Sequence, residues 1–152
     1  MPLMTASDIV TEAFYANFDP ADIKSTFIDL IEDNTIKPIL GDTLYASVSG
    51  GSPSADEITL RDTYVKPLLA YGVKSLVLAN NSPRISNVGA AYPNTPNATA
   101  TDEARMVAHK QNETLVQQLR QRLIDYLRDN ANTYGWTEQN DSDFITNSIF
   151  VV

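Results

Sequence analysis

Cysteine is absent from this chain of 152 residues. Its absence excludes disulfides, zinc–thiolate sites, iron–sulfur clusters and thiol nucleophiles, and it is typical of proteins from a reducing compartment. Basic residues are also scarce, since 11 Lys and Arg stand against 19 Asp and Glu, a net charge of −8. Proteins that bind nucleic-acid phosphates need the opposite balance, because their affinity comes from cations that displace counterions. We therefore expect no specific binding of nucleic acid.

Long apolar runs are missing too. The longest, from Leu68 to Ala79, is interrupted by Lys74 and is far shorter than the about 20 residues that span a bilayer. The first residues show neither the basic region nor the apolar region of a signal peptide. These absences predict a protein that is made in a cytoplasm and does not interact with a membrane.

Catalytic and metal-binding signatures are scarce as well. His109 is the only histidine, and it falls on a polar helical stretch, where we expect a solvated side chain or a subunit contact. Asp29, Glu32 and Asp33 lie within one helical turn and could chelate a cation, but the solvated face of an amphipathic helix explains them as well. The sequence predicts no enzyme, no cofactor and no metal site.

The sequence does contain strong helical patterns. The first segment, Ser7 to Tyr15, is expected to be either a helix capped by Ser7 or an extended arm. A second helix is predicted from Asp19 as N-cap and Pro20 as first helical residue to a stop at Pro38 and Gly41. Its predicted buried side chains are apolar and recur at helical spacing: Ile23, Phe27, Leu30 and Ile31.

The second half is predicted to consist of two longer helices. Ser54 and Glu57 form a capping box that opens a helix to Ala79, which Pro67 should kink or split and which we expect at the centre of the fold. The longest helix is expected from Thr101 to about Asn132. Its second half packs through a stripe of apolar residues, and its polar first half projects: the stripe is Leu115, Leu119, Leu123, Tyr126 and Leu127.

Two segments do not follow these helical patterns. Residues 82–100 contain three prolines and several asparagines, and so long a loop in a compact domain is usually functional or disordered. A short hairpin around Val88–Gly89 is possible there. We expect this loop to supply interface residues, namely Pro83, Ile85, Asn87, Val88, Gly89 and Tyr92.

The second such segment is the C-terminal tail, where an apolar end follows a polar stretch. Burial of each large apolar side chain is worth roughly 1.5–3 kcal/mol, so the tail needs a partner surface. It could fold back as an edge strand on its own domain or dock on another chain, as strand-adding peptides do. The predicted interface residues are Phe144, Ile145, Ile149, Phe150, Val151 and Val152.

The predicted fold is therefore mainly α, a small helical bundle with a long extended loop and an extended C-terminal tail. We expect one helical domain over residues 1–136, with the loop at 82–100, followed by the tail at 137–152. No internal repeat is evident at this level.

Several stretches resemble one known family. They are Asp19 to Gly41, Tyr64 to Asn80, Asn87-Val88-Gly89, and Arg122-Leu123-Ile124-Asp125-Tyr126-Leu127. Together they are similar to the head–tail connector (adaptor) proteins of tailed bacteriophages, particularly the crAss-like phages and other phages of Bacteroidetes. The resemblance extends over about Ser7 to Trp136.

The resemblance implies a virion structural protein of the phage neck, made in the cytoplasm of the host bacterium. Adaptors of this kind assemble as a homo-oligomer, a dodecameric ring beneath the portal protein, which extends the DNA channel and carries tail or neck proteins. DNA would pass without specific binding, as the acidic composition also suggests. The family has no catalytic residue and no cofactor.

Three other functions remain as alternatives. The first is another neck or tail-completion protein of the same particle. The second is a cytoplasmic helical regulatory module, whose tail should fold back and whose mass should be that of a monomer or dimer. The third is a small hydrolase that uses Asp29, Glu32 and Asp33.

Overall fold

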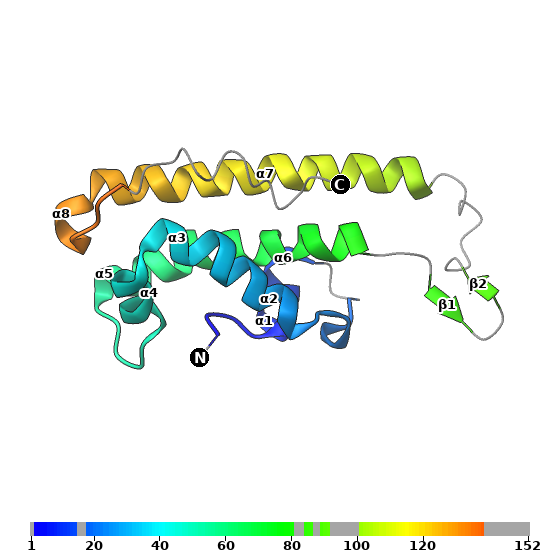
Figure 1. Cartoon of the computed structure of the whole chain (residues 1–152), viewed down its shortest axis with the longest axis horizontal. Coiled ribbons are helices and arrows are strands. Elements are labelled where there is room, and N and C mark those ends of the chain that lie inside the picture. Colours follow the sequence, from blue (N-terminus) through cyan, green and yellow to red (C-terminus); the bar gives the residue numbers. More distant parts are fainter. Residues whose placement is uncertain (1, 15–17, 81–83, 87–88, 92–100, 139–152) are drawn as a thin grey trace.

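Helix α6 (Lys66–Asn80) runs through the middle of the structure, between two layers of helices (Figure 1). Helix α7 (Thr101–Asp129) covers one side of α6, and the helices of the first half cover the other. This computed structural model describes residues 2–14, 18–80, 84–86, 89–91 and 101–138. The predicted mainly α bundle is confirmed. Within the described ranges, no helix combines the length and apolar character needed to cross a membrane.

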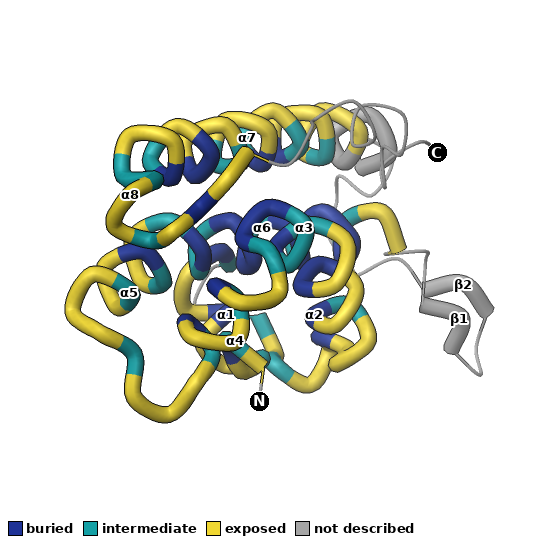
Figure 2. The backbone as a smooth tube through the Cα atoms, turned by 60° about the vertical axis from the view of Figure 1, so that its left-hand side comes forward, coloured by how far each residue is buried: buried dark blue, intermediate teal, exposed yellow. Residues whose placement is uncertain are grey.

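The central position predicted for α6 is confirmed by its burial, which extends to most sides of the helix (Figure 2). Gly72 allows the closest approach, because a Cβ built at this position would lie 2.9 Å from a methyl carbon of Ile31. The side chains of α6 that are fully buried are Leu68, Leu69, Ala70, Val73 and Ser75.

Helix α1 (Ala6–Ala13) packs on α6, and a lysine of α6 contacts the C-terminal end of α1. Lys74 Nζ donates a hydrogen bond to the carbonyl oxygen of Ala13 (2.8 Å) and lies 5.6 Å from the ring centre of Phe14. Burial lowers the pKa of this lysine. The predicted cap at Ser7 was wrong, because Thr5 and Asp8 form the capping box instead.

The predicted helix from Asp19 is broken into two pieces. Asp19 does act as a cap, but only of a single 3₁₀ turn, η1 (Pro20–Asp22), where its carboxylate accepts the Ala21 N–H (2.9 Å). Ile23 and Lys24 then adopt an extended backbone, so that α2 (Ser25–Ile31) begins later than predicted. The later start points Ile28 and Ile31 into the core and leaves Leu30 exposed at 43%, contrary to its predicted burial.

Two π-helical turns carry the chain through prolines that the sequence assigns as breaks. The turn η2 (Glu32–Ile36) joins α2 to α3 (Lys37–Leu40), and η3 (Arg61–Val65) joins α5 (Ala55–Leu60) to α6. In each turn the lysine before the proline donates its N–H five residues back, to Glu32 or Arg61. Pro38 therefore does not end the helix, which stops at Gly41 with a φ of 77°. A kink or split was predicted at Pro67, but the helix continues from η3 into α6, whose second residue is Pro67.

The two π turns belong to an internal repeat, which corrects the expectation that the chain has none. Residues 31–40 read Ile-Glu-Asp-Asn-Thr-Ile-Lys-Pro-Ile-Leu, and residues 60–69 read Leu-Arg-Asp-Thr-Tyr-Val-Lys-Pro-Leu-Leu. Both copies place an ion pair across the turn, Asp33 with Lys37 and Asp62 with Lys66 (2.9 Å in the second pair). The repeat explains why two lysine–proline pairs occur inside helices.

Glu32, which was predicted to lie in solvent, is only 5% exposed. Its carboxylate accepts two hydrogen bonds, from the Leu3 N–H (2.7 Å) and from the Tyr45 hydroxyl (2.7 Å). Tyr45 belongs to α4 (Asp42–Ser49), so Glu32 connects the N-terminal segment to that helix. Burial, followed by the bond to Glu32, raises the pKa of Tyr45.

Helix α7 packs through four of the five residues of the predicted stripe, all except Leu115, and contacts α6 through one polar side chain. Leu123 and Leu127 are fully buried, and Leu119 and Tyr126 pack against the core as predicted. Asn112, predicted to be on the projecting half, is instead buried and donates to the Tyr71 carbonyl oxygen (3.0 Å) and to Ser75. The core thus contains a satisfied amide, which fixes the register between the two helices.

The C-terminal end of the helical body returns to the first layer. After α8 (Ala131–Tyr134), Gly135 has a φ of 59° and lets the chain turn. The Trp136 indole is then buried, and its Nε1–H donates to the Ile39 carbonyl oxygen (2.7 Å). Tyr134 donates to the Asp56 carbonyl oxygen (2.9 Å), so two bonds hold this end in place.

The capping box of α5 should make stability depend on acid pH. The Ser47 hydroxyl and the Ser54 backbone N–H both donate to Glu57, and these bonds hold the pKa of its carboxyl below the ordinary value of 4.5. A lowered folded-state pKa adds stability above the unfolded pKa and loses it as the pH falls through the folded value. The urea midpoint of the wild type should therefore be higher than that of Glu57→Gln at pH 7, and the two midpoints should converge in acid. A constant difference would contradict this.

Candidate assembly surface

The structure does not bring the candidate catalytic residues together. Asp29 is exposed, Glu32 is buried against Leu3 and Tyr45, and Asp33 is paired with Lys37. In the described part of the chain, no group of three His, Asp or Glu side chains could hold a metal ion. These carboxylates therefore serve structural contacts or face solvent separately.

His109 is less exposed than predicted, since 16% of its side chain is accessible. Its Nδ1 lies 3.7 Å from a carboxylate oxygen of Glu113, one turn further along α7. Its Nε2 is buried and has no hydrogen-bond partner among the residues that the structure describes. Neither nitrogen faces a nucleophile in that part of the chain, so the pair shows no catalytic geometry.

The hairpin that the sequence left as a possibility in the long loop is present as two short strands. Strand β1 (Arg84–Ser86) pairs with β2 (Gly89–Ala91) in antiparallel register, with Ile85 opposite Ala90. Figure 1 shows the pair standing apart from the helices, beyond the end of α6. A two-stranded ribbon is marginally stable alone in water, and each strand keeps one unpaired edge within the described sheet.

The predicted loop residues divide between described and undescribed parts of the chain. Ile85 lies in β1 and Gly89 in β2. The remaining four lie outside the described residues: Pro83, Asn87, Val88 and Tyr92. The six predicted tail residues, Phe144, Ile145, Ile149, Phe150, Val151 and Val152, also lie outside them.

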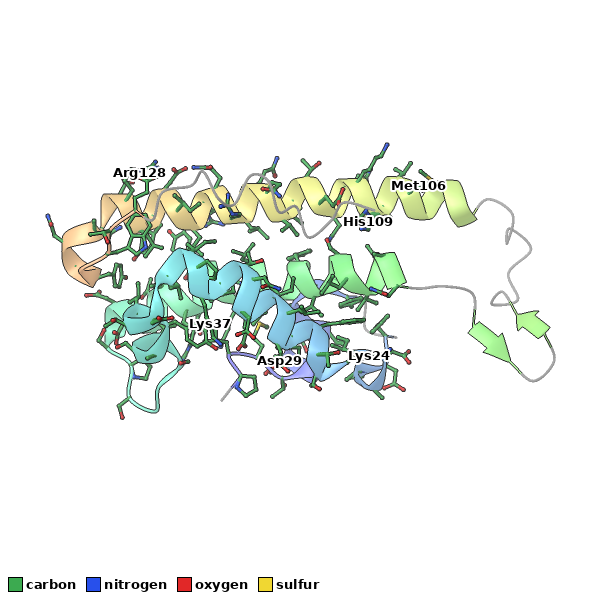
Figure 3. All side chains as sticks on the ribbon, in the orientation of Figure 1. Lys24, Asp29, Lys37, Met106, His109 and Arg128 are labelled. Carbon is green, nitrogen blue, oxygen red and sulfur yellow. The ribbon has the colours of Figure 1, made fainter. Side chains whose placement is uncertain are left out.

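Exposed apolar side chains occur on α7 at the end nearest the hairpin. Met106 is 63% exposed and Val107 49% exposed. Figure 3 places Met106 close to the first turns of α7, on the same side of the molecule as β1 and β2. Residues 106–108 and Lys110 are exposed, as the predicted projection of this end requires, whereas His109 is partly buried and Asn112 is buried.

At the other end of α7, an arginine and two tyrosines form a stack on the surface. The rings of Tyr64 and Tyr126 are stacked with an interplanar angle of 17° and centres 4.1 Å apart, and the Arg122 guanidinium lies 5.1 Å from the Tyr64 ring centre. In the described ranges, no carboxylate forms an ion pair with Arg122. Sequence reasoning missed this stack, although the i, i+4 spacing of Arg122 and Tyr126 was visible.

Arg128 holds the first residues of the tail against α7. Its guanidinium binds Glu138 (2.7 Å) and Asp125 (3.0 Å), and Glu138 raises the pKa of Arg128. Glu138 is the last described residue. The tail therefore starts beside the C-terminal half of α7.

The net charge is concentrated in one layer. Residues 1–60 contain ten acidic and two basic residues, a net charge of −8, whereas residues 61–138 contain seven acidic and nine basic residues, a net charge of +2. The first group forms the layer of α1 to α5, and the second includes α6 and α7 (Figure 1). The molecule therefore has an acidic side and a weakly basic side.

Comparison with known proteins identifies a family. No curated protein and no solved structure matches the chain. One family model, described as a family of unknown function (DUF6712), matches residues 36–143. The match includes the second π turn, the hairpin segment and all of α7. Because it spans more than half of the sequence, the chain belongs to the DUF6712 family.

Proposed function

We propose that this protein is a virion structural protein, a ring-forming connector between the portal and the tail of a tailed bacteriophage. The resemblance of its helical segments to phage adaptors suggests this role. The observation that carries the proposal is the β1–β2 hairpin, which stands apart from the helical body on the side where Met106 is exposed. A marginal hairpin beside exposed apolar side chains is a feature that gains stability from a partner.

The charge distribution supports the same role. A connector must let DNA pass without holding it, and an acidic wall repels phosphates. The layer of α1 to α5, with its net charge of −8, supplies such a surface. In the proposed ring, the hairpin and the tail meet the portal, neighbouring copies or tail proteins.

Two other candidates predict different assemblies. Another neck or tail-completion protein of the same particle would share the virion location but bind a different ring. A helical regulatory module would be a monomer or dimer with its tail folded back on its own domain. The described residues contain no arrangement that favours a hydrolase over these roles.

Native mass measurement of the full chain with and without the portal protein tests the proposal. The expected result is a complex that contains one portal assembly and many copies of this chain. Within that complex, residues 82–100 should be cut by protease at least about tenfold more slowly than in the free subunit, because interface contacts suppress local opening. Absence of a complex, or equal cleavage in both states, would contradict the connector.

A further inference from the structure

Two surfaces on opposite sides of α6 carry side chains of complementary charge. On α2, the exposed Leu30 lies next to Asp29 on the acidic side of the molecule. On α7, Arg122 lies over the Tyr64 ring on the weakly basic side. We infer that the α2 surface of one copy binds the Arg122–Tyr64 surface of the next copy, so that chains associate head to tail.

Electrostatics favours this arrangement over a symmetric pair. A symmetric contact between two α2 surfaces would bring together two layers that each have a net charge of −8. The head-to-tail contact instead places Asp29 against Arg122, whose only described partner is an aromatic ring. Like charges across an interface weaken binding, and opposite charges steer association.

The side chains on both surfaces are of the kind that contributes most to binding. Tyrosine and arginine are enriched among the residues that dominate interface energies. Here Tyr64 stacks on Tyr126 and Arg122 lies over the Tyr64 ring, so both side chains are already ordered and little freedom is lost when a partner binds. Leu30 supplies an apolar group that can cover the rings of the neighbouring copy.

The positions of the two surfaces determine what they can build. Figure 1 shows α2 and α7 on opposite sides of α6, and Figure 3 places Asp29 on the side away from α7. One copy can therefore use both surfaces at once, and repetition of such a contact gives a closed ring or an open filament. The contact specifies how neighbouring subunits of the proposed connector would bind each other. Only the closure of these contacts into a ring rests on the proposed function.

The absence of cysteine makes a cross-linking test direct. Thr26→Cys places a thiol one turn before Leu30, and Gln118→Cys places one a turn before Arg122; both positions are exposed and leave the proposed contact residues intact. Oxidation of a mixture of the two single variants should give a disulfide-linked heterodimer. The yield should be at least about tenfold above that of homodimer in either variant alone, because only the mixture can bring the two positions together.

Charge reversal then tests the contact itself. Arg122→Glu in the Gln118→Cys chain should lower the heterodimer yield about tenfold or more, and Asp29→Lys in the Thr26→Cys chain should restore it. Lys110→Glu is the matched control, since it makes the same change of charge at an exposed position three turns earlier on α7. Circular dichroism of each variant checks that the fold is retained.

Three results would overturn the head-to-tail contact: no heterodimer at any protein concentration, homodimers as abundant as heterodimers, or an equal effect of Lys110→Glu. The cross-link is scored on the purified chain without phage components. A heterodimer without a portal complex would refute the connector alone, and a portal complex without a heterodimer would refute this contact alone.

Discussion

Replacement of Glu32 by alanine is expected to lower the free energy of unfolding by about 3 kcal/mol. The carboxylate accepts hydrogen bonds from the Leu3 N–H and the Tyr45 hydroxyl, and its removal leaves two donors without a partner in a buried site. Each unsatisfied buried donor costs about 1–3 kcal/mol. Urea denaturation followed by circular dichroism at pH 7 measures the loss.

The exposed neighbour of Glu32 supplies the matched control. Asp33→Ala removes an ion pair with Lys37 at the surface and should cost at most about 0.5 kcal/mol. Glu32→Gln should give an intermediate loss, because the amide oxygen can accept one of the two bonds while the amide nitrogen faces a donor. Equal losses for Glu32→Ala and Asp33→Ala would show that the buried carboxylate does not hold the N-terminal segment.

Deletion of Ile149–Val152 is expected to abolish incorporation into phage particles while leaving helical content and the urea midpoint unchanged. These four residues are apolar and follow a polar stretch, so we propose that another chain buries them. The measurement compares particles assembled with full-length and shortened protein by mass spectrometry of purified virions. Loss should be complete, because the deletion removes four of the six apolar side chains that we expect at this interface.

A control for this deletion is serine at Thr146 and Asn147, which changes the tail without removing its apolar end. That variant should be incorporated normally. If the deletion instead unfolds the domain, the tail folds back on its own body and the regulatory module becomes the better proposal. Normal incorporation of the shortened chain would remove the tail from the list of connector contacts.

Local sequence signals predicted those elements whose ends depend on nearby residues. The capping box of Ser54 and Glu57 opens α5 as expected, and the hydrophobic spacing on α7 gave its packed stripe. Both signals act within one or two helical turns, so they can be read without knowledge of the fold.

Features that depend on distant contacts were not predictable in this way. The burial of Glu32 needs Leu3 and Tyr45, which come from two other segments. The π turns replace the helix breaks expected at proline, because the wider turn admits the proline ring, and tertiary packing holds the helix on both sides.

The assembly surface was predictable in part. The sequence left a short hairpin around Val88–Gly89 as a possibility, and the structure has strands at Arg84–Ser86 and Gly89–Ala91. The division of charge into an acidic and a weakly basic side could not be predicted without knowing which helices share a layer. Composition alone gives only the net charge of the whole chain. Tyr64 stacks on Tyr126 although the two residues are far apart in sequence. The spacing along α7 therefore indicated only that Arg122 and Tyr126 are neighbours, and not that Tyr64 packs against them.

The indole of Trp136 has a consequence for experiments in solution. It is the only tryptophan in the chain, and its bond to the Ile39 carbonyl oxygen connects the C-terminal end to α3. Tryptophan fluorescence therefore reports on a single contact, the one between Trp136 and the first layer of helices. A red shift of the emission maximum at constant far-ultraviolet ellipticity would show that this contact is lost before the helices unfold.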